Sequence, residues 1–112
     1  MEERRKSPRF TIDQLIELSF DREQFIPTRI VDLSTEGFSC RVSEAVEPLV
    51  RVFAMVRLEN GSDFLTISSE GVVVHCRRDG DEFRIGVEWS ELGGEARAAI
   101  LRLQNERLPM KS

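Results

Sequence analysis

A cluster of cations at the start of the chain has the residue types that bind phosphate or guanine. The segment Arg4-Arg5-Lys6-Ser7-Pro8-Arg9 holds three arginines and one lysine before any apolar pattern begins. An arginine guanidinium can donate two parallel hydrogen bonds, which fit a phosphate or the O6/N7 edge of guanine. Arg5 and Arg9 flank three residues, a spacing suited to holding two ends of one ligand. A solvated cationic tail is the ordinary alternative for such a run of charge.

A second group of polar residues lies where a strand should turn. Asp32-Leu33-Ser34-Thr35-Glu36-Gly37 combines a carboxylate, a hydroxyl and a glycine. An ionised carboxylate only accepts hydrogen bonds, so Asp32 suits the N1 and N2 hydrogens of guanine. Asp, Ser and Gly are also ordinary turn residues. In that alternative, Gly37 supplies a positive φ angle and Asp32 bonds the local backbone.

Taken in order, the two groups resemble the RRxxxR and (D/N)xSxxG signatures of the PilZ domain family, receptors for the bacterial second messenger cyclic di-GMP. The segments Gly71-Val72-Val73-Val74-His75 and Ile85-Gly86-Val87-Glu88-Trp89 also resemble the closing hairpin of that family. The resemblance covers nearly the whole chain. It implies a small six-stranded antiparallel β-barrel as the fold and cyclic di-GMP as the ligand.

The resemblance implies ligand contacts for three arginines. Arg5 and Arg9 are expected to bracket the ligand through guanine edges and phosphates. Arg4 is expected to stack on a second guanine or to bond it. In the family, an arginine at the place of Arg4 goes with binding of an intercalated ligand dimer, so two ligand molecules per chain are one expectation.

The resemblance also implies roles for residues of the barrel. Asp32 is expected to accept hydrogen bonds from a guanine base, Ser34 to position that contact, and Gly37 to permit close approach of the backbone. Some family members place an aromatic residue near the position of His75 against a guanine, so His75 is a further candidate. A histidine without ligand contact, in the core or partly exposed, is the alternative.

Apolar residues recur with period two over most of the chain, which predicts a mainly β domain. Asn60-Gly61 and Asp79-Gly80 are hairpin turn signals, Pro27 indicates an edge or a bulge, and Gly71 marks a bend. Helical spacing of apolar residues then predicts one C-terminal α-helix over about 92–108. The predicted strands are 11–20, 24–33, 37–42, 49–58, 64–77 and 83–89.

The chain divides into a short arm and one domain. Residues 1–10 have no apolar periodicity and contain Pro8, which predicts a flexible basic arm. The remaining residues, 11–112, predict the barrel and its helix. A chain of 112 residues is long enough for one such domain with its own core.

Composition restricts the classes of function. The net charge is −4, which argues against a general DNA- or RNA-binding protein, because such a protein neutralises phosphates. No apolar run approaches the roughly 20 residues of a membrane span, and the start lacks the apolar segment of a signal peptide. Two cysteines, Cys40 and Cys76, are too few for a disulfide framework. We therefore expect a cytoplasmic protein that does not insert into membranes.

Neither a metal site nor an active site is predicted. Cys40, His75 and Cys76 could suggest zinc, but neighbours on a strand point to opposite faces and a fourth ligand is lacking. The sequence contains no recognisable arrangement of nucleophile, base and orienting group, so we do not expect an enzyme or a bound cofactor.

These observations together predict a cyclic di-GMP receptor or adaptor, a monomer or weak homodimer, that orders its arm when ligand binds. The signal is expected to pass to a separate protein or through a change in oligomeric state. One alternative is a PilZ-like interaction module that acts independently of the nucleotide. Another is a small nucleic-acid-binding barrel, which the acidic body and the absence of tyrosine disfavour.

Overall fold

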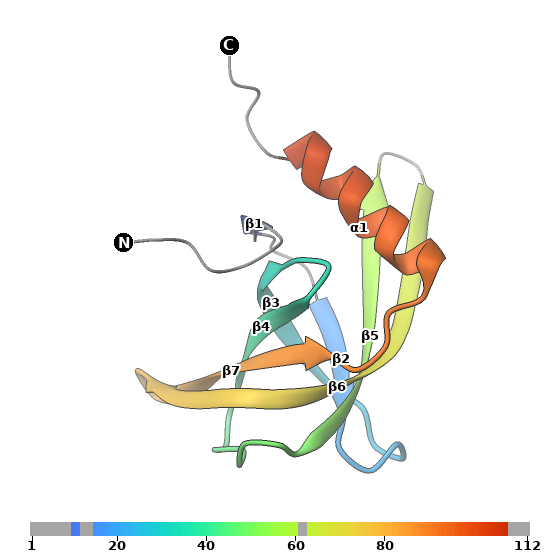
Figure 1. Cartoon of the computed structure of the whole chain (residues 1–112). Helices are drawn as coiled ribbons and strands as arrows, with labels where there is room; N and C mark the ends of the chain where they lie inside the picture. Colours follow the sequence, from blue (N-terminus) through green and yellow to red (C-terminus); the bar gives the residue numbers. More distant parts are fainter. Residues whose placement is uncertain (1–9, 12–14, 61–62, 108–112) are drawn as a thin grey trace.

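The computed structural model describes residues 10–11, 15–60 and 63–107. Figure 1 shows strongly curved strands that wrap around one core, with a helix beside one end. The strands are β1 Phe10–Thr11, β2 Leu15–Ser19, β3 Ile26–Leu33, β4 Gly37–Val42, β5 Arg51–Asn60, β6 Asp63–Asp79 and β7 Glu82–Trp89, and the helix is α1 Gly94–Arg107.

Six of the strands close an antiparallel barrel. They follow the order β3-β2-β5-β6-β7-β4, and β4 pairs back with β3. The two-residue strand β1 pairs with the C-terminal end of β3 and is not one of the six strands that close the barrel. The predicted six-stranded antiparallel barrel with a C-terminal helix is therefore confirmed. The first predicted strand, 11–20, is described only as β1 and β2, since residues 12–14 lie outside the described part.

A polar turn joins β2 to β3. The Asp21 carboxylate accepts the backbone N–H groups of Glu23, at 2.8 Å, and of Gln24, at 3.0 Å. These hydrogen bonds favour the ionised carboxylate and lower the pKa of Asp21. Pro27 follows on β3 opposite Glu17 of β2, before β3 begins to pair with β4 and before the bulge between Ile30 and Asp32.

The long strand β6 changes partners near its middle. It pairs with β5 as far as Val72 and with β7 from Gly71 onward. Figure 1 shows the strong curvature of this strand, which carries it from beside β5 to beside β7. The predicted bend at Gly71 thus marks the exchange of partners within one continuous strand.

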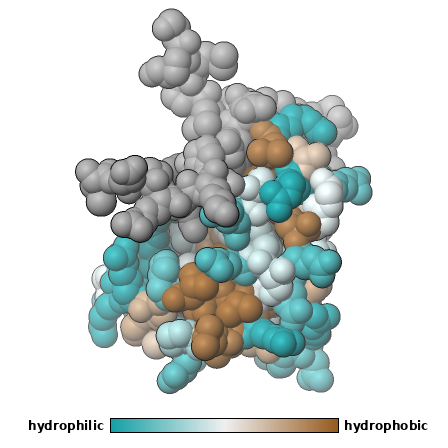
Figure 2. Space-filling view, in the orientation of Figure 1, coloured by the Kyte–Doolittle hydropathy of each residue, from teal (hydrophilic) through white to brown (hydrophobic). Residues whose placement is uncertain are grey.

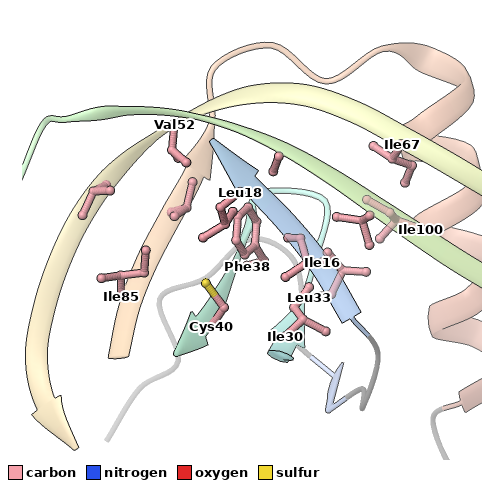
Figure 3. Packing of buried hydrophobic residues seen from close by; sticks show 14 of the residues in the cluster. Ile16, Leu18, Ile30, Leu33, Phe38, Cys40, Val52, Ile67, Ile85 and Ile100 are labelled. Atoms are coloured by element: carbon pink, nitrogen blue, oxygen red, sulfur yellow. The ribbon is translucent and has the colours of Figure 1, made fainter. Parts of the chain in front are cut away.

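The core fills the barrel and extends under the helix. Phe38 is fully buried near the centre of the cluster (Figure 3). Ile100 and Leu103 of α1 cover one end of it, which explains their helical spacing in the sequence. The helix begins at Gly94, two residues later than predicted, and Leu92 packs on the core from the preceding segment. No helix of the described part is long and apolar enough to cross a membrane.

Candidate ligand-binding site

The Asp-Ser-Gly motif forms a tight turn between β3 and β4 that its serine holds together. Ser34 is fully buried. Its hydroxyl oxygen accepts the backbone N–H of Glu36 at 3.1 Å and that of Gly37 at 3.3 Å, and its own N–H donates to the Gly37 carbonyl at 2.8 Å. These contacts within the turn fix the position at which β3 ends, and hence the position of Asp32. A contact between Ser34 and ligand remains a prediction.

The turn is also attached to the end of β7. The backbone N–H of Trp89 donates to the Glu36 carbonyl at 3.0 Å, and its indole Nε1 donates to the Ser34 carbonyl at 3.3 Å. The indole ring packs on Phe38 with the ring centroids 5.0 Å apart. Trp89 therefore connects the turn to the core, which makes the turn a rigid support.

Gly37 is needed because β7 comes close. A Cβ atom at Gly37 would lie 1.9 Å from the Val87 carbonyl oxygen, far inside van der Waals contact. Gly37 is not among the described residues with positive φ, so it does not serve as a left-handed turn residue. The close approach seen here is that of a neighbouring strand. Close approach of a ligand at Gly37 remains a prediction.

Asp32 lies on the outer face of the barrel, where Arg84 of β7 reaches it. Arg84 Nη2 is 3.3 Å from Asp32 Oδ2, and the two side chains are 31% and 18% exposed. The pair bridges β3 and β7 across the intervening strand β4. The carboxylate oxygens of Asp32 are hydrogen-bond acceptors, as the N1 and N2 hydrogens of guanine require.

Strand register aligns four residues in one row across the outer face. Asp32 of β3 is opposite Ser39 of β4, Ser39 is opposite Gly86 of β7, and Gly86 is opposite His75 of β6. We call these four residues the cross-strand row. Two bulges set this alignment, one between Ile30 and Asp32 and one between Val73 and His75. The row therefore joins the predicted aspartate and the predicted histidine, although 42 intervening residues separate them.

At its far end the row is bounded by the imidazole of His75. This side chain is exposed and lies directly over Gly86, because a Cβ atom built there would be 2.2 Å from His75 Nε2. The neighbouring Cys76 faces the other way and packs against the core, as predicted for successive residues of a strand. A guanine contact by His75 remains a prediction.

The centre of the row carries an unused polar group. Ser39 is 4% exposed, and its hydroxyl is the one buried side-chain oxygen or nitrogen of the described residues without a hydrogen-bond partner. A buried hydroxyl left unpaired costs about 1–3 kcal/mol. A ligand group that bonded Ser39 would recover part of this free energy.

Charge differs sharply on the two sides of the row. Arg84 is opposite Arg41 of β4 and Arg77 of β6, so three guanidinium groups follow one side. On the other side, Glu88 and Glu36 line a polar depression of about 610 Å³. Asp79 pairs with Arg41 and Asp32 pairs with Arg84, so the charge on the arginine side is partly balanced. An anionic ligand is nevertheless less disfavoured on that side than on the glutamate side.

A small apolar surface adjoins the polar residues. Figure 2 shows a brown patch among mostly hydrophilic residues, in the region where Figure 1 draws β6 and β7. Val74, next to His75 on β6, is 39% exposed. A flat base can stack on such a surface while its edge bonds polar groups.

The first described strand, β1, lies beside Asp32 at one end of the cross-strand row. The backbone of β1 pairs with the end of β3, with Thr11 opposite Asp32 and Phe10 opposite Leu33. Arg9 precedes Phe10 directly in the sequence. The three predicted arginines Arg4, Arg5 and Arg9 lie outside the described residues, so their ligand contacts remain predictions.

Sequence reasoning missed three residues of the candidate site. Ser39, Gly86 and Arg84 lie on strands that were predicted correctly, but their relation to Asp32 depends on strand pairing. The alternation of side chains along a strand could have identified Ser39, because it is two residues beyond Gly37 and therefore lies on the same outer face. No local sequence pattern indicates that the Arg84 side chain reaches Asp32.

The described residues contain no group of three or more side chains that could hold a metal ion. Cys40 is buried in the core, and burial raises the pKa of its thiol to about 12. Cys40 therefore has no features of a reactive or metal-binding thiol at neutral pH.

Comparison with protein families identifies the class of the chain. The model of the PilZ domain matches residues 3–106. The chain belongs to the PilZ domain family, whose members are ligand-binding and adaptor domains. A comparison with curated proteins gives no significant match.

Solved structures show the same fold. The Bacillus subtilis inhibitor of motility MotI/DgrA superposes with a TM-score of 0.83 at 20% identity, over 96% of this chain and 55% of that protein. The PilZ domain of Escherichia coli YcgR with c-di-GMP superposes with a TM-score of 0.73 at 13% identity, over 93% of this chain and 91% of that domain. The Klebsiella pneumoniae MrkH–c-di-GMP complex gives 0.68 at 14% identity, over 94% of this chain and 52% of that protein. The chain thus spans about half the length of MotI and MrkH.

Proposed function

We propose that this chain is a cytoplasmic, non-catalytic receptor for cyclic di-GMP. The observation that carries the proposal is the pairing of β1 with the end of β3, which puts the backbone of Thr11 opposite Asp32. The cationic residues precede β1 directly in the sequence, and β1 adjoins Asp32 at one end of the cross-strand row. Solved structures of YcgR and MrkH with c-di-GMP, which share the fold, add support.

In the proposed complex the ligand lies against the outer face of the barrel. Asp32 accepts hydrogen bonds from a guanine, and Arg5 and Arg9 bracket guanine edges and phosphates. His75 stacks on a base, and Arg4 contacts a second guanine when two ligand molecules bind. The phosphates face the side of Arg84 and Arg77 rather than the glutamate side, because charge favours that orientation.

The proposed output is ordering of residues 2–9 against the barrel. Ordering a segment costs about 1–2 kcal/mol per residue in backbone entropy, and like charges within the arm repel one another. Two phosphates relieve that repulsion and give the arginines acceptors, so ligand favours the ordered state. The change in shape and charge is then available to a partner protein.

Calorimetric titration of the purified chain with cyclic di-GMP tests the proposal, with GTP and a short RNA as controls. We expect selective binding at low-micromolar affinity or tighter, which corresponds to about −8 kcal/mol or more. Absence of binding at millimolar ligand in a folded sample would refute the receptor function. That outcome would favour a PilZ-like interaction module that acts independently of the nucleotide, whereas binding of the RNA alone would favour a nucleic-acid-binding barrel.

A further inference from the structure

A second candidate surface lies away from the cross-strand row, at the end of the barrel formed by the β2–β3 turn and the β4–β5 loop. These two connections lie together at the lower end of the barrel in Figure 1, and α1 lies at the upper end. Between them is an open groove of about 570 Å³. Its apolar lining includes Leu18, Phe20, Ile26, Val42, Val46 and Val50.

Part of this apolar lining is well exposed. Ile26 is 55% exposed and Phe20 is 40% exposed, although both are large apolar residues. Leu49, beside the groove in the β4–β5 loop, is 77% exposed. Contiguous exposed apolar side chains with a polar rim are typical of surfaces that bind another molecule.

The rim of the groove carries acidic side chains whose charge is not balanced by nearby cations in the described part of the chain. Glu44, Glu47 and Glu82 line it, and none of them forms an ion pair with a described residue. The cation in the lining is Arg41, whose guanidinium is already 3.3 Å from the Asp79 carboxylate. The groove therefore offers three carboxylates to a positively charged partner.

The groove is held in shape by the barrel. The Leu49 N–H donates to the Val73 carbonyl at 2.7 Å, and the Val73 N–H donates to the Val50 carbonyl at 2.9 Å. The Val46 N–H donates to Cys76 Sγ at 3.5 Å. The β4–β5 loop is thus bonded to β6 at three places. A preformed surface loses little conformational entropy when a partner binds.

We propose that this groove docks a segment of a partner protein that carries apolar side chains next to lysine or arginine. The apolar lining buries the apolar side chains, and the three glutamates pair with the cations. The acidic rim disfavours nucleic acid, anionic lipid and a free nucleotide, all of which are negatively charged. A second copy of this chain fits less well, because its net charge is also negative.

The groove is connected to the cross-strand row through β4. Arg41 lines the groove and is two residues from Ser39, on the same face of the strand. The proposal names the surface through which a receptor would act on its partner, but it stands without the nucleotide. Its test therefore uses the chain alone.

The test is an NMR titration of the isotope-labelled full chain with three matched synthetic peptides. One peptide combines leucine and lysine at helical spacing, the second has glutamate in place of lysine, and the third has serine in place of leucine. We expect saturable shifts only with the leucine–lysine peptide, centred on Ile26, Val46 and Leu49. No saturable shifts, shifts centred on α1, or equal binding of the glutamate peptide would overturn the proposal.

Two groove variants and two control variants distinguish binding in the groove from non-specific binding elsewhere on the surface. Ile26→Ser and the double variant Glu44→Lys with Glu47→Lys should each weaken the leucine–lysine peptide about tenfold. The controls are Leu101→Ser, an exposed apolar residue of α1, and Glu91→Lys, an exposed carboxylate outside the groove. Thermal unfolding confirms that each variant is folded. If the control variants lose as much affinity as the groove variants, the proposal is wrong.

Discussion

Arg41 of β4 and Arg84 of β7 lie directly opposite each other on the outer face of the barrel. Like charges in that relation are unfavourable, but each guanidinium has its own carboxylate. Arg41 is 3.3 Å from Asp79, and Arg84 is 3.3 Å from Asp32. Asp32 therefore balances Arg84 as well as serving as the predicted guanine acceptor. A guanine that bonds Asp32 must share it with Arg84 or displace that side chain.

The Asp32–Arg84 pair should contribute modestly to stability. Asp32→Asn and Arg84→Gln are each expected to lower the free energy of unfolding by about 0.5–1 kcal/mol, because the pair is only partly desolvated. Chemical denaturation of both single variants and the double variant gives the coupling energy. Strictly additive losses would show that the two side chains do not interact in solution.

The arginine arm should determine affinity for cyclic di-GMP. Arg5→Ala, Arg9→Ala and Asp32→Ala are each expected to weaken binding roughly ten- to a hundredfold, since each removes a charge-assisted hydrogen bond. Arg9→Lys should also bind weakly, because an ammonium cannot form the bidentate contact. Calorimetry measures the affinities, with Arg102→Ala on the exposed side of α1 as a matched control. Wild-type affinity in all three alanine variants would remove these residues from the site.

Ligand stoichiometry should depend on Arg4. We expect two cyclic di-GMP molecules per chain in the wild type and a shift towards one in Arg4→Ala, because Arg4 is the predicted contact to a second guanine. Calorimetric stoichiometry measures this, and NMR relaxation of residues 2–9 with and without ligand measures the proposed ordering. A single ligand in the wild type would contradict the role of Arg4. Relaxation unchanged by saturating ligand would contradict the ordering.

Gly37→Ala should destabilise the barrel. The added Cβ would meet the Val87 carbonyl oxygen, which belongs to the backbone of a paired strand and cannot easily move. We expect a loss of about 1–3 kcal/mol in the free energy of unfolding. Gly93→Ala is the matched control, since a Cβ atom there has nothing within 4 Å. Equal stability of the two variants would mean that β4 and β7 do not pack as closely as described.

The two cysteines should differ in reactivity. Burial raises the pKa of Cys40 to about 12, so almost no reactive thiolate forms near neutral pH. Cys40 should react with iodoacetamide only when the chain unfolds, whereas Cys76 is partly exposed and should react earlier. Mass spectrometry of the native and the denatured protein measures each rate. Rapid native labelling of Cys40 would contradict its place in the core.

Local patterns were sufficient for most of the elements. The strand predicted over 37–42 is β4 as observed, and the helix predicted over about 92–108 is α1 with slightly shorter bounds. Alternation of apolar residues, turn dipeptides and helical spacing report on short stretches of chain, so they are visible without the fold. The two ligand motifs were likewise visible, because each is a short run of residues.

The tertiary structure alone decided which residues lie together in the candidate site. Asp32, Ser39, Gly86 and His75 come from four strands, and their alignment depends on register. A bulge between Val73 and His75 shifts the alternation of inward and outward side chains by one residue. The face on which His75 lies therefore cannot be inferred by counting residues along β6. The reach of Arg84 to Asp32 across β4 depends on closure of the barrel. These relations are long-range, and no local pattern of the sequence encodes them.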